Sequence, residues 1–324
     1  MPPLIGSQLL DHAPDAAPSH PTLRLVAVAV VLAITVALGH PALALLAGIA
    51  TNLVVRPLMP AVVRSAGKLL LQGAIVLLGL TLSAQTLWSV SQQYAGIVVL
   101  YVLGALGLGL LFGRWIGADQ DQSRLLASGT AICGGTTIAT LAPVIRARPE
   151  SVAVCLAIVF LLNALAILAL PPLGQWLGMS QVQFGSWVAL AIHDTSSVVG
   201  AAAIYGEEAL QVATTVKLAR TLWLIPLVLI AGVLMNQREA RARVPAFVVL
   251  FVLASVLGTF VDFGAFVGTI KSASQLALIA ALFLIGTEIT RETLRSLNAR
   301  AVWLGVGLWM VALPTTYFMV MGLH

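Results

Sequence analysis

The stretch 189-ALAIHDTSSVVGAAAIY-205 decides how the rest of the chain is interpreted, because apolar flanks enclose a run of five polar residues, which are His193, Asp194, Thr195, Ser196 and Ser197. A charged residue at the centre of a bilayer costs about 2.5–3.5 kcal/mol on insertion scales. We therefore expect His193 and Asp194 to face the protein interior. They would form a substrate or proton site or, alternatively, a buried pair that satisfies nearby backbone groups.

Composition supports a membrane setting for this stretch. The chain has 324 residues, of which 60% are hydrophobic and 9% are charged, whereas soluble domains carry about 25% charged residues. Apolar segments of roughly the length that a helix needs to cross hydrocarbon recur along the chain. They predict an all-α polytopic membrane protein with about eleven segments, near 23–39, 41–55, 67–86, 94–113, 124–145, 151–170, 184–205, 208–235, 245–262, 271–290 and 299–321. Residues 1–22 are expected to be a flexible cytoplasmic tail, and 23–324 a single transmembrane domain.

The basic residues predict the orientation. Lys and Arg gather in the loops near Arg56, Arg114, Arg241 and Arg295 but not in the intervening loops. The positive-inside rule then puts the N-terminus in the cytoplasm and the C-terminus in the periplasm of a bacterial inner membrane. The loop around 146–148 carries Arg146 and Arg148, and it would lie outside if 124–145 crossed the membrane fully. It obeys the rule if 124–145 and 184–205 are re-entrant, which means that each returns to the face from which it entered. Full crossing by broken helices stays open.

Two internal similarities predict inverted repeats. The stretch 79-GLTLSAQTLWSV-90 matches 286-GTEITRETLRSL-297, at an offset of 207 residues, and the two segments run in opposite directions in the topology above. Repeat-related regions would span about 41–113 and 245–321, as in transporters with inverted repeats. A second similarity pairs 131-AICGGTTIAT-140 with 191-AIHDTSSVVG-200, which would make the two central segments equivalent.

The run 133-CGGTT-137 predicts a break in its helix, because each glycine costs about 1 kcal/mol relative to alanine. A half-helix that starts at mid-membrane directs free N–H groups and the positive end of its dipole at a cavity. Two such starts would cradle an anion, with hydroxyl groups as caps or donors. Close packing of helices through small residues is the alternative. The candidate binding residues here are Cys133, Gly134, Gly135, Thr136 and Thr137.

Lys217 and Arg220 are three residues apart inside an apolar segment, so they share one helix face. Together they could neutralise an anion, since Arg offers a fork of donors and Lys a point charge. Alternatively, either residue pairs with Asp194 or extends to a membrane face. Cys133 and Cys155 indicate neither a disulfide nor a zinc site, and no cofactor, metal or nucleic-acid signature is present.

These motifs resemble those of the YeiH-like bacterial inner-membrane proteins, a family labelled as sulfate exporters. The matching stretches are 128-SGTAICGGTTIATLAPVIRA-147, the IHD at 192–194, and 217-KLAR-220 followed by Pro226. The family pattern reads S-x-I-C-G-A-x-A, H-E and K-x-x-R. Here residues 135–137 replace its alanine-rich part and Asp194 replaces its Glu, which leaves the substrate open. The resemblance implies inverted repeats and broken helices that meet at mid-membrane, an architecture similar to bile-acid symporters and Na⁺/H⁺ antiporters.

The residues and the resemblance together favour a secondary transporter over an enzyme. It would move a small sulfate-like or sulfonate-like oxyanion by alternating access. The sequence leaves open whether H⁺ or Na⁺ is coupled to this transport. The other expected partner is the lipid bilayer, and whether two copies form a homodimer also stays open. One rival is a cation–proton antiporter that uses Asp194 and Lys217. Further rivals are an intramembrane enzyme built on His193 and Asp194 or on Cys133, and a channel or scaffold.

Overall fold

The structure is a computed structural model that describes residues 21–55, 61–235, 245–287 and 297–323. These residues contain helices and no strand. Most of the expected N-terminal tail lies outside the described residues, as do the basic loops around Arg241 and Arg295 and the greater part of the repeat at 286–297.

The helices follow the eleven apolar segments, and three segments each consist of two helices. The helices are α1 (Pro21–Leu38), α2 (Pro41–Val55), α3 (Ala61–Gly79), α4 (Ala84–Trp115), α5 (Gln120–Ala131), α6 (Gly135–Val144), α7 (Pro149–Trp176), α8 (Gln181–Ala191), α9 (Thr195–Tyr205), α10 (Glu207–Thr221), α11 (Leu224–Leu234), α12 (Ala246–Phe260), α13 (Phe266–Gly286) and α15 (Ala299–Met321). The divided segments are α5–α6, α8–α9 and α10–α11. The prediction of an all-α polytopic membrane protein is confirmed.

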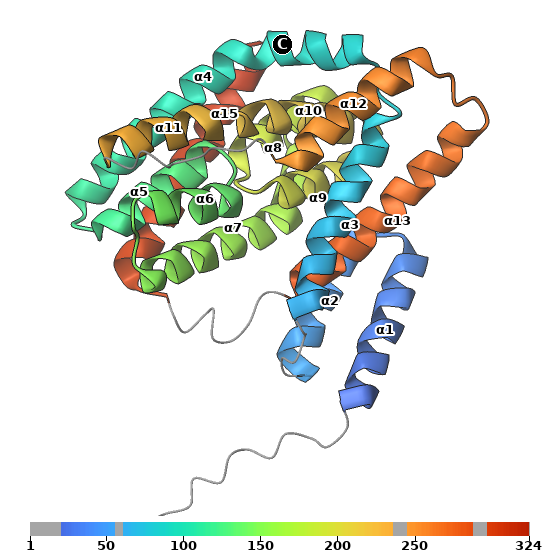
Figure 1. Cartoon of the computed structure of the whole chain (residues 1–324), viewed down its shortest axis with the longest axis horizontal. Helices are drawn as coiled ribbons and strands as arrows, with labels where there is room; N and C mark the ends of the chain where they lie inside the picture. The colour runs from blue at the N-terminus through green and yellow to red at the C-terminus, as the bar shows by residue number, and fades with distance from the viewer. Residues whose placement is uncertain (1–20, 56–60, 236–244, 288–296, 324) are drawn as a thin grey trace, which may run out of the picture.

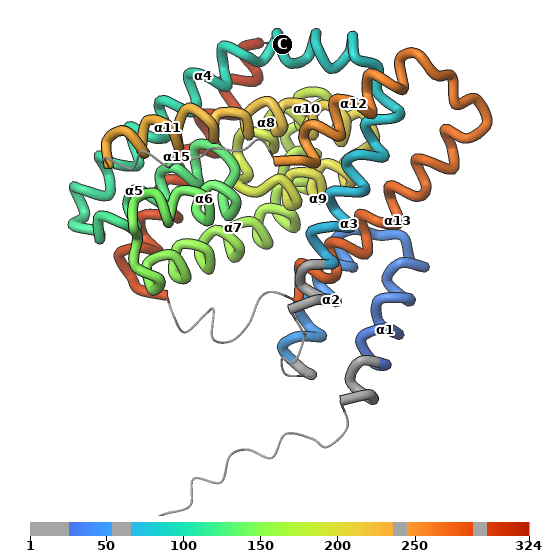
Figure 2. Tube along the Cα trace, viewed as in Figure 1, coloured from blue at the N-terminus to red at the C-terminus, as the bar shows by residue number. Residues whose placement is uncertain are grey.

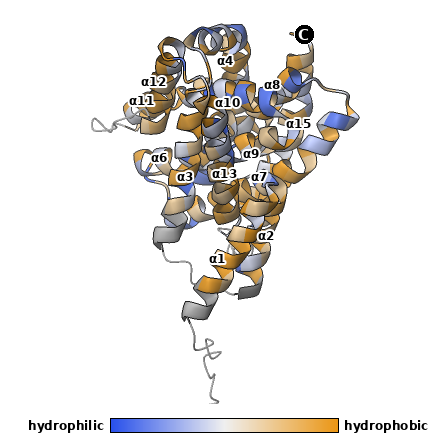
Figure 3. Cartoon of the chain, turned by 90° about the vertical axis from the view of Figure 1, so that its right-hand side faces the viewer, coloured by the Kyte–Doolittle hydropathy of each residue, from blue (hydrophilic) through white to orange (hydrophobic). Residues whose placement is uncertain are grey.

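Within the described residues, five helical stretches are long and apolar enough to cross a membrane: α4, α7, the stretch Glu207–Leu234, α13 and α15. Large apolar side chains lie exposed on their outer faces, among them Leu111 and Trp115 of α4 and Phe318 of α15. The hydrophobic colouring of outward-facing helices is visible in Figure 3. Exposed apolar surface on this scale is expected where lipid replaces water as the solvent.

The helices form two bundles (Figure 1). The scaffold bundle contains α1, α2, α3, α12 and α13, and the hairpin bundle contains α4 to α11 and α15. In the scaffold bundle α3 and α13 make the most extensive helix pair. Ser274 Oγ donates to Ala74 O at 2.8 Å, and a Cβ on Gly67 would lie 3.0 Å from Leu284 Cβ. Since residue numbers rise on one helix as they fall on the other, α3 and α13 are antiparallel.

The glycines that begin the two repeat copies make equivalent contacts. A Cβ on Gly79 would lie 2.8 Å from Phe251 O of α12, and a Cβ on Gly286 would lie 2.5 Å from Leu45 O of α2. Thus α3 ends against α12 while α13 ends against α2, which is the reciprocal packing expected of inverted repeats.

Both central segments are re-entrant hairpins, a point that the sequence left open (Figure 2). Asp119, the N-cap of α5, forms an ion pair with Arg148, the N-cap of α7, so α5–α6 returns to the face where it began. On the second hairpin, Gln181 Oε1 accepts from Glu208 N at 3.0 Å and from Ala209 N at 3.3 Å. The start of α8 therefore lies beside the start of α10, and α8–α9 also returns to its own face.

The hairpins enter from opposite faces because α7 runs from the end of the first to the start of the second. An α-helix rises about 1.5 Å per residue, so the 12 residues of α5 extend roughly 18 Å into a hydrocarbon core of about 30 Å. Re-entry puts Arg148 on the same face as Arg300, whose Nη1 donates to Gly117 O at 3.2 Å. This agrees with the positive-inside pattern, and the cytoplasmic assignment of that face stays a prediction.

The reciprocal packing predicts that Gly79→Ala destabilises the protein while Gly73→Ala, on the same helix, does not. A Cβ at Gly79 meets the Phe251 backbone, whereas nothing lies within 4 Å of one at Gly73. Overpacking costs about 1–3 kcal/mol of folding stability. Each kcal/mol lost lowers the midpoint of thermal unfolding by roughly 2–4 °C in a large domain. We expect thermal unfolding in detergent to show a lower midpoint for Gly79→Ala alone. Equal midpoints for both variants would contradict the proposed contact.

Candidate functional site

The tips of the two hairpins touch. Gly134 is the N-cap of α6 and has φ 50 and ψ −116, a backbone conformation that glycine adopts readily and other residues rarely adopt. A Cβ there would lie 3.0 Å from both His193 Cβ and Val159 Cγ1. The absence of a side chain at Gly134 therefore allows the first tip to pack against the second tip and against α7. The predicted helix breaks are confirmed at these positions.

The two tips are built alike. Ile132 is the C-cap of α5 and Ile192 is the C-cap of α8, while Gly134 and Asp194 are the N-caps of α6 and α9. The local similarity between 131–140 and 191–200 thus aligns caps with caps. Each tip ends one half-helix and starts another, which leaves backbone carbonyls at one end and backbone N–H groups at the other without helical partners.

Lys217 of α10 bridges the tips. Its side chain is 0% exposed, and Nζ donates to Ile132 O at 3.2 Å, Ile192 O at 2.8 Å and His193 O at 2.5 Å. One ammonium group thus binds carbonyl oxygens from both hairpins. Carbonyls at a helix C-terminus carry the negative end of the helix dipole, so a cation there is stabilising.

Arg220, one turn along α10, does the same with its fork of donors. It is 0% exposed, and Nε donates to Ile132 O at 2.6 Å, Nη1 to Leu190 O at 2.5 Å and Nη2 to Ile192 O at 3.0 Å. The guanidinium carbon lies 5.2 Å from the centre of the Tyr101 ring, within cation–π range. Arg220 thus links α5, α8 and α4 around one buried charge.

Other side chains complete the carbonyl capping. Trp309 Nε1 donates to Ala191 O at 3.2 Å, and Tyr101 OH donates to Thr130 O at 3.2 Å. Every carbonyl from 190 to 193 accordingly accepts a side-chain hydrogen bond. Among the described residues Lys217 forms no ion pair with Asp194, and its side chain is fully buried. Neither alternative that the sequence left open for this lysine, pairing with Asp194 or extension to a membrane face, therefore occurs.

The N-terminal ends of the two tips differ. At α9, the half-buried Asp194 accepts from Ser196 N at 3.1 Å and also contacts Ser196 Oγ. At α6, Gly134 supplies no side-chain cap. Thr137 Oγ1 instead accepts from Cys133 N at 3.1 Å and lies 3.2 Å from Cys133 Sγ. A carboxylate therefore caps the start of α9, whereas no side chain caps the start of α6.

The structure brings most of the predicted site residues together at the tips. Buried residues among them are Cys133, Gly134, Gly135, Thr137, His193, Thr195, Ser196, Ser197, Lys217 and Arg220. The other two are Asp194, which is half-buried, and Thr136, which lies on the exposed side of α6. Its carbonyl accepts from Thr140 Oγ1 at 2.8 Å.

Asn163 of α7 is a further buried polar residue, which the sequence did not identify as a site residue. Asn163 is 3% exposed and His193 is 2% exposed. Neither Asn163 Oδ1, Asn163 Nδ2 nor His193 Nδ1 has a hydrogen-bond partner among the described residues. The sequence could have indicated Asn163 only as a lone polar residue within the apolar run 151–170. That it lies on a helix packed against the tips is evident only from the tertiary structure.

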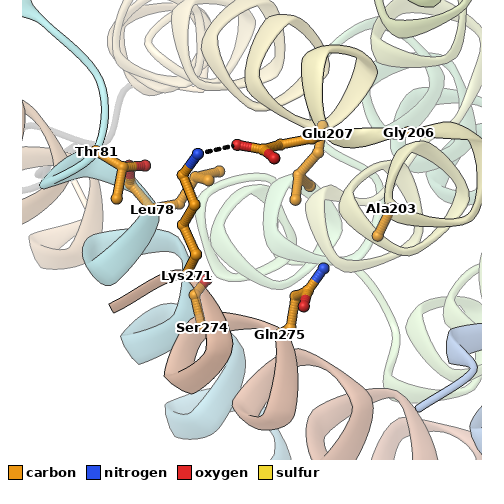
Figure 4. Close-up of a pocket in the computed structure, with 9 residues that line it drawn as sticks. Leu78, Thr81, Ala203, Gly206, Glu207, Lys271, Ser274 and Gln275 are labelled. Atoms are coloured by element: carbon orange, nitrogen blue, oxygen red, sulfur yellow. Dashed lines mark hydrogen bonds and ion pairs between the residues drawn. The ribbon is translucent and has the colours of Figure 1, made fainter. Parts of the chain in front are cut away.

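A cavity lies between the two bundles (Figure 4). An ion pair between Lys271 of α13 and Glu207 of α10 spans it. Its other lining residues are Leu78, Thr81, Ala203, Gly206, Leu210, Ser274 and Gln275. The sequence selected none of these residues. Several of them lie near the start of α10, so the cavity is at the face where α8 and α10 begin.

No group of three or more metal-ligating side chains is present among the described residues, and Cys133 and Cys155 are both free and buried. The fold and site thus define a class of protein: an all-helical membrane protein whose two opposed re-entrant hairpins meet beside buried cations. The family described as "Conserved hypothetical protein 698" matches residues 22–305, and the chain belongs to it. The YeiH-like resemblance is confirmed.

Relatives agree with this membership. The chain is 41% identical over 254 residues to a UPF0324 membrane protein of Bdellovibrio bacteriovorus, covering 76% of this chain and 78% of that protein. It is 39% identical over 279 residues to a UPF0324 membrane protein of Porphyromonas gingivalis, with 84% of each chain covered. A third, from Bacteroides thetaiotaomicron, is 38% identical over 274 residues, covering 84% of this chain and 83% of that protein. No solved structure matches the chain.

The tip contact predicts that Gly134→Ala is more damaging than Gly178→Ala. Both glycines have positive φ, so an alanine is strained at either position. Only at Gly134 would the new Cβ press on His193 and Val159, since nothing lies within 4 Å at Gly178. We expect a lower thermal midpoint in detergent for Gly134→Ala, because the tip contact adds there to the backbone strain of φ 50 and ψ −116. A larger effect of Gly178→Ala would refute it.

Proposed function

We propose that the protein is a secondary transporter that moves a small oxyanion, with sulfate and sulfonates as the first compounds to test. The observation that carries the proposal is the complete burial of Lys217 and Arg220 at the meeting point of two opposed hairpins. Buried charges within a membrane domain are expensive and mark substrate or ion pathways. Here the charges are positive and fixed by backbone carbonyls.

Electrostatics at the tips favour an anion. Among the residues of the two tips and the buried residues Lys217 and Arg220 of α10, the formal charges are two cations and one carboxylate, Asp194, so the sum is +2 − 1 = +1. Two further carboxylates of α10, Glu207 and Glu208, lie exposed at its start, away from the tips. The C-terminal helix ends of α5 and α8 offset part of this excess, and the N-terminal ends of α6 and α9 add to it. The asymmetry of the caps then directs the anion to α6, because Asp194 already occupies the start of α9.

Backbone N–H groups at the start of α6 would hold the anion, as at other helix N-termini that bind oxyanions. Gly135 and Thr137 belong to this first turn, and the hydroxyls of Thr195 and Ser197 belong to the opposite one. Lys217 and Arg220 would act from behind the tips, since their donors are used by carbonyls. They would raise the local potential without direct contact with the anion.

The two bundles supply a route for alternating access. Transporters with inverted repeats move one bundle against the other around a central site. In this chain the scaffold bundle contacts the hairpin bundle chiefly through α2 with α9 and α12 with α4, and less extensively elsewhere. The Lys271–Glu207 ion pair joins the bundles at one face. A shift between the bundles would break this exposed pair at low cost, because such pairs contribute about 0–1 kcal/mol.

Counterflow into proteoliposomes tests the proposal. Vesicles loaded with an unlabelled oxyanion should accumulate the labelled compound for at least one of sulfate, sulfite and methanesulfonate. Lys217→Gln, which keeps donors but removes the charge, should lower the rate about tenfold or more. Arg300→Gln removes an equal charge at a membrane face and should leave the rate unchanged. A lack of saturable counterflow would favour a channel or scaffold, and product formation without a gradient would favour an enzyme.

Asp194→Asn separates anion transport from the cation-antiporter alternative. The amide oxygen can still accept from Ser196 N, so the cap on α9 is retained while one negative charge is lost. We expect anion affinity, measured by thermal shift or titration, to stay the same or rise. If Na⁺ instead stabilises the wild type and Asp194→Asn abolishes that effect, the protein is a cation carrier that uses Asp194 and Lys217.

A further inference from the structure

We infer that Asn163 and His193 bind the transported anion directly at the start of α6, and that this anion carries a hydroxyl donor besides its acceptor oxygens. The inference rests on the proposed function. It adds a residue of α7 to the site and narrows the substrate class to singly protonated oxyanions, such as hydrogensulfite, hydrogencarbonate or dihydrogenphosphate.

The neighbours of Asn163 on α7 fix its position. Val159, one turn earlier, lies 3.0 Å from the position of a Cβ on Gly134 at the first tip. Ile167, one turn later, lies 3.7 Å from that of a Cβ on Gly200 of α9. Residues four apart share a helix face, so Asn163 lies on the face of α7 that contacts the first tip one turn earlier and α9 one turn later.

His193 reaches the same place from the second tip. Its Cβ is 3.0 Å from the position of a Cβ on Gly134, so the imidazole begins against the N-cap of α6. The backbone carbonyl of His193 is held by Lys217 at 2.5 Å, which fixes the residue while its side chain remains available. Nδ1 is buried and has no partner among the described residues.

Unpartnered buried polar atoms are uncommon in native proteins and require an explanation. The described residues contain four such side-chain atoms, and three of them belong to Asn163 and His193. The fourth, Ser123 Oγ, lies on α5 and would be next to a Cβ on Gly113 of α4. The three unpartnered atoms come from α7 and the second tip, the two elements that pack against Gly134 at the uncapped start of α6.

The chemistry of this set determines the ligand class. The N–H groups of α6 and Asn163 Nδ2 donate and therefore need acceptor oxygens. Asn163 Oδ1 accepts and needs a donor, which sulfate, nitrate and methanesulfonate lack. A singly protonated oxyanion provides both, and its negative charge suits the cation excess at the tips. Leaving one buried acceptor unsatisfied should weaken binding by about tenfold.

A binding panel on the purified full-length wild type tests the ligand class. The probes are hydrogensulfite, hydrogencarbonate and dihydrogenphosphate against sulfate, nitrate and methanesulfonate, at pH 6.5–7 (roughly, where the protonated forms persist) and equal ionic strength. We expect at least one hydroxyl-bearing anion to bind about tenfold more tightly than every anion of the second group. Equal or tighter binding of sulfate or methanesulfonate would overturn the assigned class.

Variants test the assignment of Asn163. Asn163→Leu is similar in size and removes two unpartnered atoms, so its thermal midpoint should equal or exceed that of the wild type, while its affinity for the preferred anion should fall about tenfold or more. Ser123→Ala removes the other unpartnered group and should bind as the wild type does. Asn163→Ser serves as a second variant if Asn163→Leu does not fold, with the same expected loss.

The outcomes separate the two proposals. Unchanged affinity in Asn163→Leu, or in Asn163→Ser if that variant is needed, would refute the role of Asn163 while leaving the oxyanion transporter intact. A wild type that neither binds nor transports any anion of either group would refute the proposed function itself.

Discussion

The structure depends on the neutralisation of two helix C-termini inside the membrane. A re-entrant hairpin must end one helix and begin another at mid-depth, where no water is present to satisfy the freed carbonyls. Lys217 and Arg220 provide the required donors, and both reach the carbonyl of Ile132 as well as that of Ile192. Because the same two cations serve both tips, α10 joins hairpins that enter from opposite faces. Without this link each tip would carry unpaired carbonyls in an apolar surrounding.

The N-terminal ends of the tips show how a nearly symmetric framework acquires a polarity. Ile132 and Ile192 have the same position in their hairpins, as do Gly134 and Asp194. Asp194 places a carboxylate at the start of α9, whereas Gly134 allows the tips to approach closely but supplies no acceptor. This difference of one side chain underlies the assignment of the proposed anion position to α6.

The scaffold bundle supports the hairpins without sharing their polar character. Its helices pack through glycines, with Gly79 against α12 and Gly286 against α2, so backbones come close where lipid offers no hydrophobic driving force. α7 has the complementary role inside the hairpin bundle. It is long enough to span the membrane, separates the two entry points, and contacts the first tip through Val159 and α9 through Ile167, with Asn163 buried between these two contacts.

The sequence by itself determined the helical membrane class, the eleven apolar segments, the breaks near 133 and 193 and the family, because hydrophobic length and glycine or polar interruptions are local properties. It also identified Lys217 and Arg220, since charges inside an apolar segment are conspicuous. The tertiary structure alone decided that the hairpins are re-entrant, through contacts such as Asp119 with Arg148 and Gln181 with Glu208. It alone assigned the cations to carbonyls and brought Asn163 to the tips. Those facts depend on distances between segments tens of residues apart, and no local pattern encodes such distances.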